Sequence, residues 1–142
     1  MNARTFPVID GRRWLVTGDL ARLTPDGRYE FLGRQNICIN TGGEKVFPEE
    51  VEAVLLTHSA VRDVRIVGVP DPRFGRRVAA VVQLADESGD TAALEAELDT
   101  LVRASLARFK VPRLYVFTDA PLRLNNGKPD YRTAQRLADG AA

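Results

Sequence analysis

Cysteine and histidine are nearly absent from the chain, which contains Cys38 and His58 as the only examples of each. A single cysteine excludes an internal disulfide and a multi-cysteine metal site, and a single histidine excludes a histidine-rich site. Long hydrophobic runs are also missing: no apolar stretch approaches the roughly 18 residues of a transmembrane helix, and the first residues lack the apolar segment of a signal peptide. These absences predict a cytoplasmic protein.

Neither sign of charge dominates the composition. The chain has 20 lysine and arginine residues against 19 aspartate and glutamate residues, a formal net charge of +1. This balance excludes a bulk electrostatic attraction to nucleic acid or to an anionic membrane. With 142 residues, of which 44% are apolar and 27% charged, the composition is typical of a soluble globular protein of about one domain.

Hydrophobic periodicity and turn residues predict alternating strands and helices. In chain order, the predicted elements are a hairpin over 14–32, a hairpin around 40–43, a helix starting at Pro48, neighbouring antiparallel strands over 64–69 and 77–84, an amphipathic helix marked by Leu94 to Phe109, a third strand over 114–117 and a last helix started by Pro129 and Asp130. Because strands and helices alternate only in part, we predict an α+β fold. Its expected parts are a small antiparallel three-stranded sheet plus a β-hairpin, packed with about three helices and preceded by a further hairpin.

The first 35 residues do not look able to close a core alone, since two strands are marginal without a partner. We therefore interpret residues 1–35 as the end of another, larger domain. Residues 36–142 are expected to form a self-contained domain.

Four short strings carry the functional signal when they are considered together. They are WLVTGD (14–19), FLGRQNICINTGGEKVFPEEVE (31–52), IVGVPDP (66–72) and RLNNGKPDYR (123–132). In this order and at these separations the chain resembles, over nearly its whole length, the C-terminal part of the AMP-forming adenylating enzymes: acyl-CoA synthetases, luciferases and peptide-synthetase adenylation domains. The string GGEKVFPEEVE, with GKPDYR, is most similar to actinobacterial fatty-acyl-CoA ligases, including those acting on steroid side chains.

The resemblance implies a two-step ligase reaction. A carboxylate joins the α-phosphate of ATP and releases pyrophosphate, and the thiol of coenzyme A then attacks the acyl-adenylate. Between the steps the C-terminal domain swings about a hinge and presents another face to the same active site. ATP, coenzyme A and Mg²⁺ are the implied cofactors, and the N-terminal domain of the same enzyme is the implied partner. No metal ligands are identified in this chain.

Lys128 is the expected catalytic residue. It matches the family lysine whose ammonium offsets the negative charge that builds on the α-phosphate. Asn125, Asn126 and Gly127 would let the backbone lie close to the nucleotide. A glycine-lysine pair alone would be only a turn; within LNNGKPDYR the resemblance favours the catalytic interpretation.

Three further residues match nucleotide and hinge positions. The carboxylate of Asp19 is expected to accept hydrogen bonds from the ribose hydroxyls, and Arg34 to contact the nucleotide near the hinge. The alternatives are a turn aspartate and a solvated strand-end arginine. Asn36 stands at the hinge, where the family usually has aspartate or lysine; this departure leaves an ordinary loop asparagine as an alternative.

The coenzyme A side is expected at Gly42 and Gly43, whose missing side chains permit close backbone approach to a narrow ligand. A hairpin turn with positive φ is the rival explanation. Lys45 and three arginines could meet the coenzyme A phosphates or form a solvated face: Arg73, Arg76 and Arg77. Cys38 is expected to be a small apolar strand residue and His58 to lie at a helix end. Trp14 is expected to pack.

The phosphate loop and the acyl pocket of a complete ligase have no counterpart in these residues. We therefore expect this chain to be a C-terminal lid that is inactive alone. Two alternatives remain open at this point: a stand-alone binding or regulatory module of the same fold, and an adenylation-domain lid that serves a carrier protein.

Overall fold

The computed structural model describes residues 4–85 and 90–142. The chain divides into two compact units, Met1–Asn36 and Ile37–Ala142.

The first unit consists of two hairpins. Its strands are β1 (Val8–Ile9), β2 (Arg12–Arg13), β3 (Asp19–Leu23) and β4 (Tyr29–Arg34), and it leads into the 3₁₀ helix η1 (Gln35–Ile37). The β3–β4 hairpin confirms the prediction for 14–32, although its first strand begins at Asp19. The β1–β2 hairpin was not predicted; Asp10 and Gly11 form its turn with φ of 51° and 73°, a conformation for which an Asp-Gly pair is a known signal. Trp14 is 54% exposed, so the expectation that it packs is wrong for this chain.

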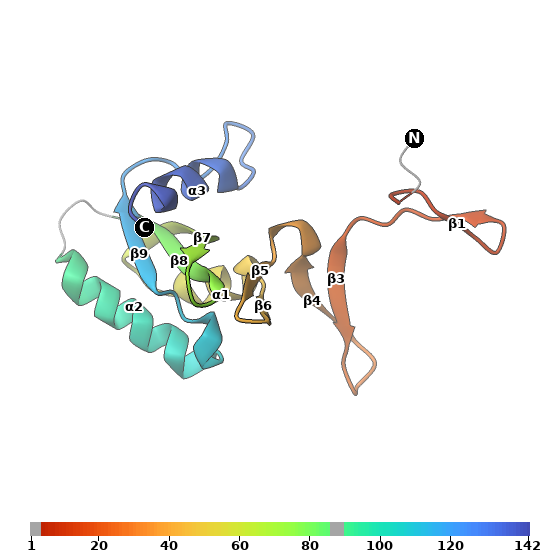
Figure 1. The fold of residues 1–142 in the computed structure, drawn as a ribbon, viewed down its shortest axis with the longest axis horizontal. Coiled ribbons are helices and arrows are strands. Elements are labelled where there is room, and N and C mark those ends of the chain that lie inside the picture. Colours follow the sequence, from red (N-terminus) through yellow and green to blue (C-terminus); the bar gives the residue numbers. More distant parts are fainter. Residues whose placement is uncertain (1–3, 86–89) are drawn as a thin grey trace. The chain divides into compact units, whose positions relative to one another are not determined.

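The second unit is built on a three-stranded sheet flanked by helices (Figure 1). Its elements are β5 (Ile39–Thr41), β6 (Glu44–Val46), α1 (Pro48–Leu55), β7 (Val61–Asp71), β8 (Gly75–Leu84), α2 (Thr91–Ser105), η2 (Arg108–Lys110), β9 (Leu114–Thr118) and α3 (Tyr131–Asp139). The small β5–β6 hairpin and the long β7–β8 hairpin are both antiparallel, as predicted. The α+β class is therefore confirmed.

The third strand corrects one part of the predicted sheet. β9 pairs with β8 in parallel, from Ala79 opposite Leu114 to Gln83 opposite Thr118. The prediction of an all-antiparallel sheet is wrong because the connection from β8 to β9 passes through α2. A crossover of this length returns the chain to the same end of the sheet, which makes the new strand parallel.

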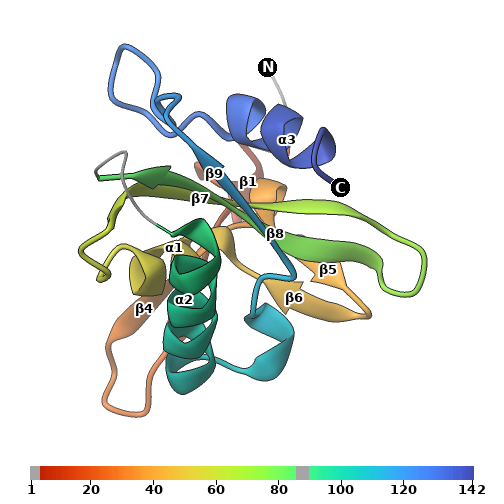
Figure 2. The same cartoon turned by 90° about the vertical axis from the view of Figure 1, so that its left-hand side faces the viewer.

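Both faces of the sheet are buried, which explains the nearly continuous apolar runs of β7 and β8. On one face, α1 and α2 pack on Val64, Ile66, Val78, Ala80 and Val82. On the other face, α3 packs on Val67, Val69, Ala79 and Val81. Figure 2 shows α2 in front of the sheet, with α3 along another side.

The helix boundaries follow from capping residues. Asp90 caps α2 by accepting hydrogen bonds from the amides of Ala92 and Ala93, and α2 ends at Ser105, so Phe109 lies in η2 and not in the predicted long helix. Asp130 caps α3 by accepting from the Thr133 amide. Pro129 therefore precedes the helix, contrary to the prediction, and is bridged to Arg123 across the turn that holds Lys128.

Candidate functional site

Lys128 lies at the end of a tight, hydrogen-bonded turn between β9 and α3. The Leu124 amide donates to the Lys128 carbonyl at 2.9 Å, and the Gly127 amide donates to the Leu124 carbonyl at 2.8 Å. Gly127 has φ of 79°, the left-handed region in which a residue with a side chain would be strained. Lys128 is exposed, and no hydrogen bond or ion pair of its ammonium is found among residues 4–85 and 90–142. The turn therefore presents a charge to solvent from an ordered backbone.

The base of this turn is anchored in the core of the second unit. Leu122 is fully buried among residues of α3, β7 and β8. The Asp130 amide donates to the Leu122 carbonyl at 2.9 Å, which joins the two ends of the turn. The position of Lys128 is thus fixed by packing as well as by its own hydrogen bonds.

A buried ionic cluster lies behind the turn, formed by Glu52, Asp63 and Arg65. All three residues are at most 7% exposed. Arg65 lies 2.8 Å from the Asp63 carboxylate and 3.8 Å from the Glu52 carboxylate. The Glu52 carboxylate also accepts from the Ile66 amide at 2.9 Å and from the Tyr131 hydroxyl at 3.1 Å. Sequence reasoning missed this cluster, whose signal was the pair of opposite charges inside the valine-rich run of β7.

Burial dominates the electrostatics of Glu52. Desolvation raises the pKa of its carboxyl from 4.5 to about 7, against the lowering effects of the Ile66 amide, Arg65 and Tyr131. The pKa of the Tyr131 hydroxyl is raised as well, by desolvation first and then by the Glu52 charge. The cluster therefore contains a carboxyl group that binds its proton more tightly in the folded chain than in the unfolded one.

This raised pKa predicts a pH dependence of stability. The contribution of Glu52 is fully present below about pH 4.5 and is lost as the pH rises to about 7, because the folded state holds a proton that the unfolded state has released. The free energy of unfolding of wild type, relative to Glu52→Gln, should fall by about 3 kcal/mol across this range. Urea unfolding of both chains between pH 4.5 and 8 measures the difference.

Glu95→Gln, on the exposed face of α2, is the matched control and should leave the dependence of the unfolding free energy on pH unchanged. Parallel pH dependences for wild type and Glu52→Gln would contradict the prediction.

Asp19 and Arg34 lie side by side in the first unit. They are directly paired in the register of β3 and β4. The Arg34 Nε lies 3.5 Å from an Asp19 carboxylate oxygen, and the two side chains are 66% and 42% exposed. An exposed pair of this kind adds less than about 1 kcal/mol to stability. Both groups remain accessible to a polar ligand. Asn36, the predicted hinge, lies in η1 at the last position of the first unit.

The Gly42–Gly43 turn lies against Phe74 in the second unit. The Gly42 amide donates to the Phe74 carbonyl at 3.0 Å. Gly42 has φ of 59°, and a Cβ atom there would lie 3.0 Å from the Phe74 ring. Both the turn conformation and the close approach therefore require glycine at this position.

A cavity of about 580 Å³ opens beside Phe74. Its lining combines two aromatic rings, three arginines and one carboxylate: Glu44, Arg73, Phe74, Arg108, Phe109 and Arg113. The guanidinium groups of Arg73 and Arg113 lie 5.1 and 5.5 Å from the centre of the Phe74 ring. Arginines over an aromatic floor suit a flat, anionic ligand. Sequence reasoning missed Phe74, Arg108, Phe109 and Arg113, which come together only through the contact between two distant segments.

The other basic residues predicted for this region have different positions. Arg76 donates to the Gly68 carbonyl at 2.5 Å and is directed toward its own hairpin. Arg77 and Lys45 do not line the cavity. Of the four predicted cations, only Arg73 reaches it.

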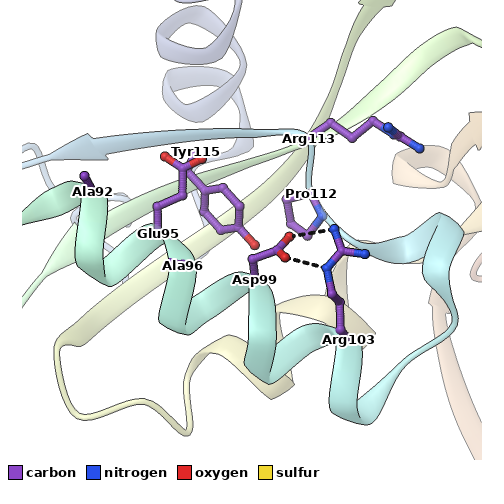
Figure 3. Close-up of a pocket in the computed structure, with 8 residues that line it drawn as sticks. All are labelled: Ala92, Glu95, Ala96, Asp99, Arg103, Pro112, Arg113 and Tyr115. Carbon is purple, nitrogen blue, oxygen red and sulfur yellow. Dashed lines mark hydrogen bonds and ion pairs between the residues drawn. The ribbon is translucent and has the colours of Figure 1, made fainter.

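A second cavity of about 620 Å³ lies between α2 and β9 (Figure 3). Asp99 is paired there with Arg103, and Glu95 adds a second carboxylate. The hydroxyl of Tyr115 is buried without a hydrogen-bond partner in the described part of the chain. The two carboxylates are balanced by Arg103 and Arg113 in the same lining, whereas three arginines and one carboxylate line the cavity beside Phe74. The cavity beside Phe74 therefore has the more positive lining.

Cys38 and His58 show no catalytic arrangement. Burial raises the pKa of the Cys38 thiol, which keeps it protonated and unreactive. His58 contacts Glu97 at 3.1 Å and accepts from the Ala60 amide just beyond α1, a helix-end role as predicted. Within residues 4–85 and 90–142, no group of three metal-ligating side chains is found, and no helix has the length and apolar character to cross a membrane.

Comparisons with known proteins agree with this architecture. The family model described as "AMP-binding enzyme C-terminal domain" matches residues 50–128. The chain is 51% identical over 137 residues to a medium/long-chain-fatty-acid–CoA/3-oxocholest-4-en-26-oate–CoA ligase of Mycobacterium tuberculosis, covering 96% of the chain and 24% of that protein. It is 50% identical over 131 residues to a 3-oxocholest-4-en-26-oate–CoA ligase of Rhodococcus rhodochrous, covering 92% and 23%.

A solved structure extends the comparison to three dimensions. The anthranilate CoA ligase AuaEII in complex with anthranoyl-AMP superposes with a TM-score of 0.83 at 29% identity, covering 98% of this chain and 26% of that one. The chain therefore spans about a quarter of the length of the relatives that it matches.

Proposed function

The chain belongs to the AMP-binding enzyme C-terminal domain family, and from this premise we propose that it is the mobile C-terminal domain of a fatty-acid–CoA ligase. The ligase would activate a carboxylic acid with ATP to an acyl-adenylate, releasing pyrophosphate, and transfer the acyl group to the thiol of coenzyme A, releasing AMP. The observation that carries the proposal is the exposed Lys128 ammonium on an anchored turn, for which residues 4–85 and 90–142 supply no ion-pair partner. Such a charge forms no contact that stabilises the described fold and is well suited to a ligand that arrives from another domain.

Lys128 would act in the first step. Attack of a carboxylate on the α-phosphate brings two anionic groups together and builds charge on the phosphate oxygens. A compact ammonium reduces both penalties, and it can do so only if its position is already fixed when the substrates meet. The hydrogen-bonded turn from Leu124 to Lys128 supplies that fixed position.

Asp19 and Arg34 would hold the nucleotide. A carboxylate has two acceptor oxygens and suits the two hydroxyls of a ribose. Arg34, beside it, would direct its guanidinium to oxygen atoms of the nucleotide. ATP would bring Mg²⁺ bound to its phosphates.

The cavity beside Phe74 would receive the nucleotide end of coenzyme A in the second step. Its aromatic rings can stack on adenine, and Arg73, Arg108 and Arg113 can contact phosphates. Gly42 and Gly43 adjoin this cavity and would let the pantetheine arm pass close to the backbone. Lys45, on the neighbouring strand β6, would add positive charge at the entrance.

Asn36 would serve as the hinge between two domain parts. We propose that residues 1–35 complete the large N-terminal adenylating domain and that residues 36–142 form the lid. The compact units divide between Asn36 and Ile37, which supports this assignment. Asparagine tolerates the unusual backbone angles that a pivot needs.

The proposed acid is a fatty acid or the carboxylated side chain of a steroid. Support comes from the names of the relatives that are about 50% identical to this chain. The cytoplasm, where ATP and coenzyme A are both present, is the proposed location.

Arg113→Gln should separate the two steps in the complete ligase. Loss of a charge-assisted contact to a phosphate should raise KM for coenzyme A about 10-fold or more, while pyrophosphate release from ATP and acid stays at the wild-type rate. Steady-state thioester formation and single-turnover pyrophosphate release, measured with a medium-chain fatty acid, check both halves.

Arg62→Gln is the matched control for this experiment. Arg62 is an exposed arginine that donates to the Ala85 carbonyl, and its loss should alter neither step. An unchanged KM for coenzyme A in Arg113→Gln would remove the cavity from the proposal. Absence of any acid-dependent pyrophosphate release by the wild-type ligase, tested across short to long chains and a steroid acid, would overturn the function itself.

A further inference from the structure

We propose that Arg123, anchored on the buried carboxylate of Asp63, is a positioning residue that sets the direction of Lys128 for acyl-adenylate formation. The inference rests on the proposed function of Lys128 and extends it to a residue that does not touch the substrate. It is carried by one continuous set of contacts that runs from the core to the peptide bond preceding Lys128.

The contacts begin at Asp63, which is held from three sides. One carboxylate oxygen accepts from the Val64 amide at 3.0 Å. The other receives the Arg65 guanidinium at 2.8 Å and the Arg123 Nε at 2.9 Å. The Asp63 side chain is only 5% exposed, so these charge-assisted interactions are weakly screened. Asp63 is therefore a fixed point to which Arg123 is attached.

Arg123 links Asp63 to the turn that holds Lys128. Its Nη1 donates to the Gly127 carbonyl at 3.1 Å. That carbonyl belongs to the same peptide unit as the Lys128 amide, and the amide donates to the Asn126 side-chain oxygen at 3.1 Å. Both ends of the peptide unit are thus held, and its orientation determines where the Lys128 Cα–Cβ bond points.

Such control is needed because the turn contains Asn125, Asn126 and Gly127, residues with many accessible backbone conformations. A displacement of the reacting groups by about 1 Å can lower a rate by about 100-fold. Arg123 is half exposed and Asp63 keeps Arg65 as a partner, so the loss of Arg123 should cost little stability. Arg123 matters because it bridges Asp63 and the Gly127 carbonyl, and not because it stabilises the fold.

The test uses the complete ligase with Arg123→Ala. We expect pyrophosphate release in single turnover to slow by about 10- to 100-fold, with KM values for ATP and acid little changed and with thioester formation from supplied acyl-adenylate at the wild-type rate. Arg123→Lys, which can reach Asp63 or the Gly127 carbonyl but not both, should recover only part of the rate. Hydrogen exchange should quicken in residues 123–129 and nowhere else.

A double-mutant cycle separates positioning from a structural effect. If Arg123 acts through Lys128, Arg123→Ala should have almost no further effect on adenylation in a Lys128→Ala background. Arg136→Ala, on the exposed face of α3, is the matched control and should retain full activity.

The outcomes distinguish the inference from the function on which it rests. Wild-type pyrophosphate release by Arg123→Ala overturns the positioning role, and so does an equal loss in both backgrounds. Full adenylation by Lys128→Ala alone overturns the proposed function instead.

Discussion

Lys128→Ala in the complete ligase should lower the rate of pyrophosphate release by about 100- to 1,000-fold, the usual effect of removing one preorganised donor from a developing anion. Thioester formation from supplied acyl-adenylate should continue near the wild-type rate. This split is expected because the α-phosphate charge is fully developed only during the first step. In the second step the acyl-adenylate already exists, and under the proposed function the domain would present its Gly42 side to the active site.

The same experiment needs a variant that keeps the volume of the Lys128 side chain but removes its charge. Lys128→Met keeps most of the side-chain volume and should be as slow as Lys128→Ala if the ammonium is what matters. Arg132→Ala removes a nearby exposed charge from the first turn of α3 and should leave both steps intact. If Lys128→Ala released pyrophosphate at the wild-type rate, the 123–132 segment would be only a turn.

The sequence predicts this segment well because its signals are local. Asparagine, glycine and proline specify a turn without reference to the rest of the chain, and Asp130 caps α3 within three residues of itself. The Gly42–Gly43 turn is predictable for the same reason. Helix α1 begins at Pro48 with acidic residues in its first turn, which again requires only neighbours in sequence.

Features that depend on contacts between residues far apart in sequence cannot be predicted from neighbouring residues alone. The parallel direction of β9 is decided by the crossover through α2, not by the composition of residues 114–118. The cavity beside Phe74 needs a hairpin loop and the η2 segment, more than thirty residues apart in sequence, to meet. The sequence proposes Asp19 and Arg34 separately as nucleotide ligands, whereas their pairing follows from the register of β3 and β4.

The buried cluster of Glu52, Asp63 and Arg65 also depends on contacts between distant residues. From the sequence alone, a charged residue in a valine-rich strand is expected to be exposed to solvent, because most arginines are exposed. Arg65 is nevertheless 2% exposed, since Asp63 and Glu52 supply its partners and the Tyr131 ring lies 5.9 Å from its guanidinium carbon. Only the tertiary fold brings these groups from α1, β7 and α3 together.

Arg65→Met should therefore destabilise the chain by about 3–5 kcal/mol at pH 8, the usual effect of removing one partner from a buried ionic group. Methionine retains much of the volume against Tyr131, so the loss reflects the missing charge: Glu52 loses its ion-pair partner, and Asp63 keeps only Arg123. Lowering the pH should reduce the deficit because protonation removes the carboxylate charge, and Glu52→Gln in the same chain should restore part of the stability. Urea unfolding at pH 5 and pH 8 measures the loss of stability in the single and double variants.

Arg62→Met, which replaces an exposed arginine of the same strand, is the control and should lose less than about 1 kcal/mol. A deficit for Arg65→Met as small as that of Arg62→Met would mean that Asp63 and Glu52 do not depend on Arg65, and Asp63 could then not serve as the fixed point for Arg123.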